Sequence, residues 1–405
     1  MRFLSSGQSS SSAFVSPSLV RNVTLVALLP ASLLASASAF AQVPPPAVNA
    51  RSWVLVDATA NQVLASGNPD ERAEPASLTK LMTAYLVFEA LQSKKISMDQ
   101  VVMPSEGVRR VKTDESRMFI EPNKPVSVHD LVYGMIIQSG NDAAIALAEL
   151  VGGSEPNFVN MMNAEAKRLG MAHTHFADVN GMPDPQHYTT AGDLATLSTH
   201  LIRDYPEYYG IFSVKEFKYN NIKQPNRNRL LWIDPTVDGL KTGHTQAAGY
   251  CLIASAKRPL ADGGARRLVS VMMGENKEHD RVEDSMKMLN YGYSAYDSTR
   301  IYKANQAIAT PRVFKGQADS VSVGVKKDEY VTLPKGAVSN AKPQLELTSP
   351  LIAPIADGQQ VGTAKFVGAD GKVLAQVPVV ALHTVPQAGV VGRVWDSLML
   401  MVSKK

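Results

Sequence analysis

A serine and a lysine stand three residues apart in the segment Pro75–Lys80. The apolar pattern that follows predicts a helix from about Ser77, so the Ser77 and Lys80 side chains should leave the same helical face. A serine hydroxyl becomes a nucleophile only when a base removes its proton, and a lysine kept neutral by its surroundings is such a base. The pair therefore indicates an activated serine, although one Ser-x-x-Lys spacing is also expected by accident in a chain of this length.

Two further short motifs follow in order. The Ser-Gly-Asn motif Ser139–Asn141 lies in a predicted break between two helices, and the Lys-Thr-Gly motif Lys241–Gly243 precedes a predicted strand. A second Ser-x-Asn match, Ser66–Asn68, comes before the nucleophile at the end of a strand and is interpreted as a turn. Each motif alone is common, but all three in this order and context form a specific signal for penicillin-interacting serine enzymes.

Helices before and after a group of hairpins must position these motifs. Apolar periodicity and capping signals predict helices that begin near residues 77, 128, 142 and 281. Alternating patterns and turn residues predict strands over residues 52–58, 62–66, 230–232, 250–257 and 267–274. Elements in this order imply an α+β fold with helices packed on an antiparallel sheet.

With their flanking residues, the motifs closely resemble the low-molecular-mass penicillin-binding proteins, specifically D-alanyl-D-alanine carboxypeptidases of the S11 peptidase type. The matching segments are Glu74–Lys80, Ser139–Ala143 and Asp238–Thr245, and the resemblance runs from about Ala50 to the C-terminus. It implies a penicillin-recognising serine-transferase fold, like that of β-lactamases and DD-peptidases. It also implies an enzyme without a cofactor that removes the terminal D-alanine from peptidoglycan pentapeptide stems and is inhibited by β-lactam antibiotics.

Three residues should carry the catalysis. Ser77 is the predicted nucleophile, because a helix N-terminus places a positive dipole near the developing alkoxide charge. Lys80 is the predicted base, and burial together with a nearby Lys241 cation should disfavour its charged form. Ser139 should relay a proton from Lys80 toward the leaving amine.

Six residues should bind the substrate: Asn141, Lys241, Thr242, Gly243, His244 and Arg281. Asn141 should hold Lys80 with its carbonyl and the substrate with its amide. Lys241 and Thr242 should meet the terminal carboxylate. Gly243 should let the strand approach the substrate backbone, and the His244 main-chain N–H should complete the oxyanion hole. Arg281 matches by position a family arginine that grips the free carboxylate, a task suited to a planar guanidinium.

The two ends of the chain predict export and membrane attachment. Residues 1–41 are a predicted signal peptide, because an apolar stretch leads to the small-residue cleavage signal Ala39–Ala41. The predicted catalytic domain covers residues 42–298, and alternating runs predict a small β-sandwich domain at 299–385. Residues 386–405 form a predicted amphipathic helix that is too short to span a bilayer. We expect a periplasmic enzyme attached to the outer face of the cytoplasmic membrane.

The composition agrees with a large exported enzyme. The 405-residue chain has a net charge of +4 and one cysteine, Cys251. Since a single thiol cannot form an internal disulfide, an apolar core must stabilise the fold. The mildly basic charge does not indicate binding to nucleic acid.

Other hydrolase classes fit the sequence less well. The chain has neither a Gly-x-Ser-x-Gly nor a His-Glu-x-x-His motif. His173, His175 and Asp178 lack an evident further pair of ligands, so no metal site is predicted. A class A β-lactamase would need a glutamate between Ala177 and His200, and none occurs there. Two alternatives stay open: a DD-endopeptidase, and a non-catalytic penicillin-binding or wall-binding protein.

Overall fold

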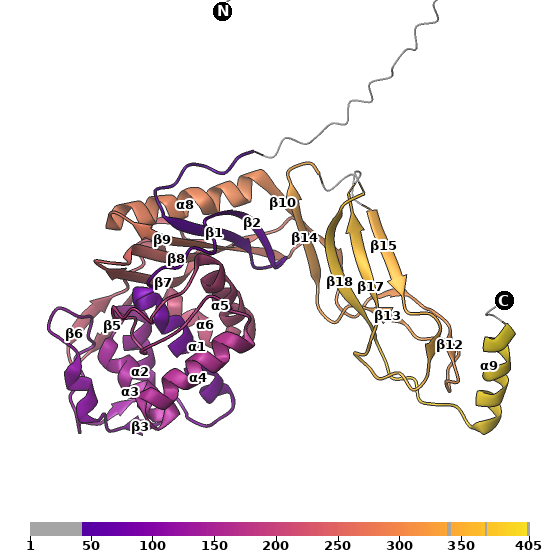
Figure 1. Ribbon diagram of the computed structural model, residues 1–405, viewed down its shortest axis with the longest axis horizontal. Helices are drawn as coiled ribbons and strands as arrows, with labels where there is room; N and C mark the ends of the chain where they lie inside the picture. Colours follow the sequence, from indigo (N-terminus) through magenta and orange to yellow (C-terminus); the bar gives the residue numbers. More distant parts are fainter. Residues whose placement is uncertain (1–42, 338–341, 369–370, 403–405) are drawn as a thin grey trace, which may run out of the picture. The chain divides into compact units, whose positions relative to one another are not determined.

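The computed structural model describes residues 43–337, 342–368 and 371–402. The predicted signal peptide therefore lies outside the described residues. The α+β architecture predicted from the sequence is confirmed, because helices pack on an antiparallel sheet, a small all-β domain follows in the chain, and a C-terminal helix is present (Figure 1).

One five-stranded antiparallel sheet carries the Lys-Thr-Gly motif. Its order is β2-β1-β9-β8-β7. The strands are β1 (Ser52–Asp57), β2 (Gln62–Gly67), β7 (Val237–Thr245), β8 (Gly249–Pro259) and β9 (Ala265–Glu275). The predicted hairpin at 52–66 and the two long predicted strands are confirmed. The motif strand β7 lies at one edge of the sheet, and an edge strand leaves one row of backbone N–H and C=O groups outside the ladder.

Alternate residues of the sheet enter two different cores, as the pleat of a strand requires. Val54 and Val56 of β1 belong to the core shared with α1 (Lys80–Gln92). Leu55 between them belongs to the core beneath α8 (Glu278–Ala295). Figure 1 shows α8 along one side of the sheet and the cluster of helices around α1 on the other.

Ser77 precedes the central helix instead of opening it. It lies in the 3-10 turn η1 (Ala76–Thr79), and α1 begins only at Lys80. The chain enters this turn through Ala76 at a φ of 48°, which a right-handed helix does not allow, so regular helix starts later than the sequence predicts. Apart from Glu89, the residues of α1 from Leu81 to Leu91 are all buried, as expected for a helix at the centre of a core.

The remaining elements of this part surround α1 and the motifs. The helices are η2 (Glu106–Arg110), α2 (Val128–Tyr133), η3 (a π turn, Gly134–Gln138), α3 (Asn141–Gly152), α4 (Glu155–Arg168), α5 (Ala191–Asp204), α6 (Pro206–Tyr209), η4 (Gly210–Ser213) and α7 (Leu230–Ile233). The short strands are β3 (Val101–Val102), β4 (Val126–Ser127), β5 (Glu216–Tyr219) and β6 (Ile222–Pro225).

Two sequence predictions about these helices have clear outcomes. The cap predicted at Ser127 is confirmed, because its Oγ accepts a hydrogen bond from Asp130 N at 3.0 Å. The strand predicted at residues 230–232 is wrong, since these residues form α7. There Asn228 Oδ1 accepts a hydrogen bond from Leu230 N at 3.1 Å and starts a helical turn in place of a strand.

The all-β domain has its own sheet and core. Its five-stranded sheet has the order β11-β13-β18-β17-β15, and its core is mainly valine, including Val321, Val323 and Val379. The strands after α8 are β10 (Tyr296–Tyr302), β11 (Ala307–Ala309), β12 (Val313–Phe314), β13 (Val323–Gly324), β14 (Glu329–Pro334), β15 (Lys342–Leu347), β16 (Leu351–Ile352), β17 (Gln360–Val367) and β18 (Val373–Ala381).

The final helix α9 (Val390–Val402) presents apolar side chains to solvent. Val391 is 85% exposed and Trp395 65% exposed. Within the described part of the chain, no helix is long and apolar enough to cross a bilayer.

Glu275 at the end of β9 is a buried carboxyl whose ionisation should weaken the fold. Burial, followed by the nearby Asp284 and Asp280 carboxylates, raises its pKa from 4.5 to about 8. The unfolded chain ionises this group above pH 4.5 and the folded chain only above about 8, so stability should fall as the pH rises through this window. Glu275→Gln should therefore melt at a higher temperature than the wild type at pH 9, by the equivalent of several kcal/mol, since one pKa unit is worth about 1.4 kcal/mol.

Near pH 4 the two proteins should melt at similar temperatures, because Glu275 is protonated in both states of the wild type. The matched control is Glu283→Gln on α8, since the Glu283 side chain is half-exposed. Its carboxylate forms an exposed pair with His279 at 2.8 Å, and such a pair is worth at most about 1 kcal/mol, so the effect of Glu283→Gln should stay small from pH 4 to pH 9. A constant difference between Glu275→Gln and the wild type from pH 4 to pH 9 would contradict the assignment.

Candidate active site

Ser77 and Lys80 meet in the core beneath a cleft. Lys80 Nζ lies 2.9 Å from Ser77 Oγ and 3.0 Å from the backbone oxygen of Asn180. Lys80 is 1% exposed, and burial is the main reason that its pKa falls from 10.5 to about 7. A neutral amine at hydrogen-bond distance from a hydroxyl is the arrangement that removes a serine proton. The side-chain contact predicted from the three-residue spacing is present.

The fixed cation near Lys80 is Arg227, which the sequence did not single out. Burial lowers the pKa of Lys80 most, and the Arg227 guanidinium lowers it further. The sequence predicts Lys241 in this role. The two amines are close enough to oppose each other's charge, because burial and then the Lys80 cation lower the pKa of Lys241. A guanidinium keeps its proton where a buried amine does not, so Arg227 is the lasting positive charge.

Ser139 and Asn141 stand at the junction of η3 and α3. Ser139 has a left-handed backbone, with φ 67° and ψ 32°. Its buried Oγ and the buried Oδ1 of Asn141 have no hydrogen-bond partner among the described residues. Asn141 Nδ2 donates to Glu115 Oε2 at 2.6 Å. The sequence predicts that the Asn141 carbonyl holds Lys80, but the Asn180 main-chain oxygen takes that hydrogen bond.

Gly243 brings β7 against the turn that carries Ser77. A Cβ at Gly243 would lie 3.0 Å from the Pro75 carbonyl oxygen and 3.3 Å from Ala76 Cβ. The sequence predicts that this glycine makes room for a substrate, and close packing on the nucleophile turn is a further reason for a glycine at this position. Thr242 lines the cleft, and the buried Lys241 Nζ donates to the Thr242 carbonyl oxygen at 3.1 Å.

Arg281 and His244 flank the same strand. Arg281 is buried and donates through Nη1 to the Gly243 carbonyl oxygen at 3.2 Å and through Nη2 to Glu278 Oε1 at 2.9 Å. The His244 ring stacks on Tyr250, with ring centroids 4.0 Å apart. Burial, followed by the Arg281 cation, lowers the pKa of His244, so its imidazole is uncharged near neutral pH.

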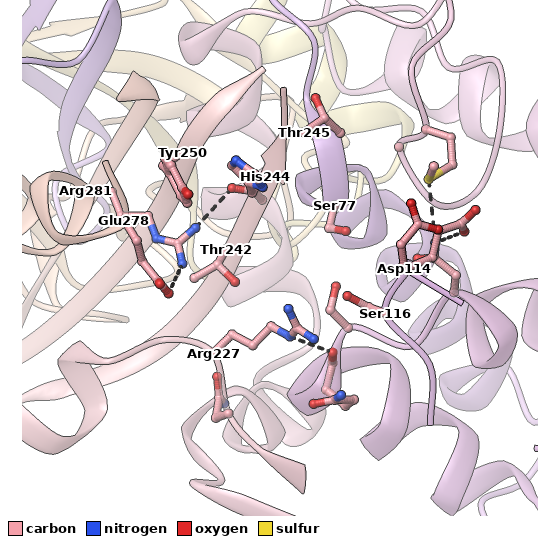
Figure 2. A pocket seen from close by; sticks show the side chains of 18 of the residues that line it. Ser77, Asp114, Ser116, Arg227, Thr242, His244, Thr245, Tyr250, Glu278 and Arg281 are labelled. Atoms are coloured by element: carbon pink, nitrogen blue, oxygen red, sulfur yellow. Dashed lines mark hydrogen bonds and ion pairs between the residues drawn. The ribbon is translucent and has the colours of Figure 1, made fainter. Parts of the chain in front are cut away.

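These side chains surround one cleft with a volume of about 720 Å³. Figure 2 shows Ser77 between the Arg281, Tyr250 and His244 side chains on one side and Asp114 on the other, with Arg227 below. The cleft brings together the predicted residues Ser77, Ser139, Asn141, Thr242, Gly243, His244 and Arg281, while Lys80 and Lys241 lie buried beneath it.

Sequence reasoning missed several residues of the cleft wall, and one sequence signal was available. Asparagine and arginine alternate at residues 226–229, and the two asparagines are buried anchors. Asn226 Nδ2 donates to the Val214 carbonyl oxygen at 2.9 Å, and Asn228 Nδ2 donates to the Gly239 carbonyl oxygen at 2.9 Å. These two anchors hold the segment in place, and Arg227 and Arg229, the residue after each anchor, line the cleft.

The segment at residues 173–178, which the sequence analysis considers for a metal site, makes hydrogen bonds within the protein. His175 Nδ1 lies 2.6 Å from the Gln186 carbonyl oxygen, and Asp178 accepts three backbone N–H groups. Among the residues that the structure describes, no group of three or more His, Cys, Asp or Glu side chains is placed to hold a metal ion.

The chain is similar to known proteins over most of its length. Residues 39–277 match the family model described as D-alanyl-D-alanine carboxypeptidase, peptidase S11. The D-alanyl-D-alanine carboxypeptidase DacC of Escherichia coli K12 is 43% identical over 364 residues, covering 88% of this chain and 90% of that protein. The chain belongs to the D-alanyl-D-alanine carboxypeptidase family. The resemblance inferred from the three motifs is therefore confirmed.

Solved structures extend the similarity beyond the catalytic region of this D-alanyl-D-alanine carboxypeptidase family member. Penicillin-binding protein 5 from Haemophilus influenzae is 41% identical, has a TM-score of 0.77, and covers 85% of this chain and 100% of its own. Residues 296–387 match the C-terminal domain of penicillin-binding protein 5. Penicillin-binding protein D2 from Listeria monocytogenes, solved with ampicillin bound, is 32% identical with a TM-score of 0.55, and the alignment covers 62% of this chain and 100% of that one.

Proposed function

We propose that this chain is a serine-type D-alanyl-D-alanine carboxypeptidase that removes the terminal D-alanine from peptidoglycan pentapeptide stems through an acyl-enzyme on Ser77. The observation that carries the proposal is the buried Lys80 amine, whose Nζ lies 2.9 Å from Ser77 Oγ and whose pKa is lowered to about 7. Membership of the family supports the choice of substrate, because relatives over most of the chain bear that activity in their names.

The proposed reaction has two halves. Neutral Lys80 takes the Ser77 proton, and the serine oxygen attacks the carbonyl between the two D-alanines while the backbone N–H groups of Ser77 and His244 stabilise the oxyanion. Ser139 passes the proton from Lys80 to the departing amine, so D-alanine leaves and an ester remains on Ser77. Water then hydrolyses the ester and restores the serine hydroxyl.

Polar and charged groups at the cleft give the enzyme its preference for a chain end. Thr242, Lys241 and Arg281 are the proposed partners of the free carboxylate, and Asn141 and the Gly243 backbone those of the peptide. Arg281 supports this role because its buried Nε has no hydrogen-bond partner among the described residues. An unpaired guanidinium N–H beside a cleft can donate a charge-assisted hydrogen bond to a carboxylate oxygen.

β-Lactams should acylate the same serine and persist there. A lactam amide opens without releasing a separate leaving group. The opened ring therefore remains in the cleft, attached to Ser77 as an ester. The ampicillin-bound structure of the Listeria relative supports β-lactam binding by this fold. The non-catalytic alternative is less favoured, because Ser77 and Lys80 are in contact.

Incubation with a pentapeptide ending in D-Ala-D-Ala should release free D-alanine, and Arg281→Met should lower kcat/KM for this peptide by about 10²-fold. The reason is that a hydrogen bond to a charged group is worth up to about 3 kcal/mol. Product analysis identifies the released D-alanine, and the rate of its release gives kcat/KM for the wild type and for Arg281→Met. The same peptide with a C-terminal amide should be a poor substrate for both proteins.

The control for Arg281→Met is Arg229→Met, which removes another arginine of the cleft wall and should change kcat/KM by less than about threefold. Cleavage of cross-linked dimers without release of D-alanine from pentapeptides would replace the proposal with the DD-endopeptidase. Binding of penicillin without any product would replace it with the non-catalytic alternative.

We also propose that the chain is exported and held at the outer face of the cytoplasmic membrane by α9. Deletion of residues 389–405 should move the enzyme from the membrane fraction to the soluble fraction with its activity retained. The support is the exposed apolar side of the helix, which includes Val391 and Trp395. Fractionation followed by penicillin labelling measures both properties.

A double change, Val391→Ser with Trp395→Ser, should release the enzyme as the deletion does, whereas Ser397→Ala on the same helix should not. A full-length mature protein that is already soluble without detergent would show that α9 is not an anchor.

A further inference from the structure

A closed ring of contacts encloses Lys80 beneath the cleft. Lys80 Nζ donates to the Asn180 carbonyl oxygen at 3.0 Å. Asn180 belongs to the loop at residues 177–190, and Gly181 in this loop packs so closely on the nucleophile turn that a Cβ there would lie 1.7 Å from the Ala76 carbonyl oxygen. The loop is therefore a rigid support for both Ser77 and Lys80, and not a loose surface segment.

Asp178 fixes the conformation of this support. Its Oδ1 accepts hydrogen bonds from Asn180 N at 2.7 Å and Gly181 N at 2.6 Å, and its Oδ2 accepts one from Met182 N at 3.1 Å. Three consecutive amides bound to one carboxylate orient the peptide groups between them. The Asn180 carbonyl that meets Lys80 belongs to one of these peptide groups.

His187 closes the ring. The side chain is 1% exposed. Its Nε2 lies 2.9 Å from Thr79 Oγ1, and its Nδ1 accepts a hydrogen bond from Ala177 N at 3.3 Å and lies 3.6 Å from Asp178 Oδ2, a contact longer than a hydrogen bond. Thr79 is the residue directly before Lys80 in the chain. The path from Lys80 through Asn180, Asp178, His187 and Thr79 thus returns to Lys80.

We propose that Asp178, supported by His187, is a positioning residue for the base: it holds the carbonyl that orients the Lys80 amine and places a fixed negative charge beside it. This inference rests on the proposed function of Lys80. When the Asn180 carbonyl takes one N–H of the neutral amine, the nitrogen lone pair is left to face the Ser77 hydroxyl. The charge of Asp178 opposes the loss of the Lys80 proton, so it keeps the base strong enough to take the proton back from serine.

Several charged groups face Lys80 from different elements. Burial has the largest effect on its pKa, and Asp178 has the next largest, in the raising direction. Arg227 lowers the pKa, while Glu115 and Asp142 raise it. Lys241 on β7 is coupled to the same amine. Since the carboxyl pKa of Asp178 is itself held low by His187 and the Gly181 and Asn180 amides against the opposing effect of burial, Asp178 stays charged across the range in which Lys80 titrates.

The test is the pH dependence of the acylation rate of Ser77 by a fluorescent penicillin. In the wild type the rate should rise with pH to a plateau as Lys80 loses its proton. Asp178→Asn removes the negative charge, so the pH of half-maximal rate should fall by about 0.5 to 1 unit and the plateau by about tenfold. Asp178→Glu keeps the charge but misplaces it, so the plateau should fall while the half-maximal pH stays at the wild-type value.

Asp178→Thr is a second neutral variant, because its hydroxyl still accepts backbone N–H groups of the loop; it should show the same shift if Asp178→Asn does not fold. The matched control is Asp193→Asn. Asp193 is a buried carboxylate near the same loop that accepts from His173 N at 2.9 Å and Thr174 Oγ1 at 2.6 Å. It should lower the melting temperature and leave the pH profile unchanged.

Two results would overturn the inference in different ways. A half-maximal pH equal to that of the wild type in a folded Asp178→Asn or Asp178→Thr enzyme would refute the role of Asp178 and leave the proposed function intact. A wild-type protein that no penicillin labels at any pH would refute the proposed function, and this inference with it.

Discussion

Replacing Lys80 with methionine is expected to slow acylation of Ser77 by about 10³-fold at neutral pH. The amine is the only group among the described residues that forms a hydrogen bond with Ser77 Oγ, at 2.9 Å. A positioned general base contributes about 10² to 10⁴ to the rate of such a step. Methionine fills nearly the same space without a lone pair of comparable basicity. The second-order rate of labelling by fluorescent penicillin measures the effect.

The same variant should be at least as stable as the wild type, because folding no longer takes an amine out of water. Lys80→Met should therefore melt at an equal or higher temperature at pH 6, where the wild-type lysine is mostly charged. The control is Lys95→Met at the end of the same helical region, whose Nζ donates to the Val151 carbonyl oxygen at 2.7 Å and which lies outside the cleft. Normal labelling of a folded Lys80→Met enzyme would show that another group is the base.

Ser77→Ala is expected to abolish covalent labelling by penicillin and the release of D-alanine altogether. No base restores this loss, since the oxygen that forms the ester is gone. Intact-mass measurement after incubation with a β-lactam should show one adduct on the wild type and none on the variant. Weak non-covalent binding of the peptide should survive, because the cleft and its cations are unchanged.

A second serine of the same cleft is the matched control. Ser116 lines the cleft wall but is not in contact with Lys80 in any hydrogen bond of the described residues, so Ser116→Ala should keep the adduct. Equal labelling of Ser77→Ala and wild type would end the proposal that Ser77 is the nucleophile. The labelling rate of Ser139→Ala should lie between that of Ser77→Ala and that of the wild type, because a proton relay affects the rate of acylation without forming the ester.

The charges of the site divide into two groups by distance from solvent. Lys80 and Lys241 are buried, and burial lowers the pKa of both. Arg227 and Arg281 border the cleft and keep their charge. A neutral amine for proton transfer thus lies buried beneath a cleft whose arginines supply a permanent positive field for a carboxylate. No short sequence motif specifies which of these charged residues is buried and which borders the cleft, because that depends on the tertiary structure.

The sequence predicted the parts of this protein that depend on local spacing. Ser77 and Lys80 touch because they stand three positions apart in a helical turn, and that spacing brings side chains together in η1 and α1 alike. The hairpin at 52–66 and the cap at Ser127 were predictable for the same reason, since turn and cap chemistry acts over a few residues. The strand predicted at 230–232 was wrong because Asn228, itself anchored on the Gly239 carbonyl oxygen, starts a helical turn there.

Only the tertiary structure decided what surrounds the reacting pair. The carbonyl that holds Lys80 comes from Asn180, 100 residues further along the chain, and the lasting cation comes from Arg227. Asp178 and His187 join this environment through contacts between separate elements. Residue types and spacing determine which groups are present and which neighbours in sequence meet. Burial and long-range charge set the pKa of Lys80, and these arise only when distant segments pack around it.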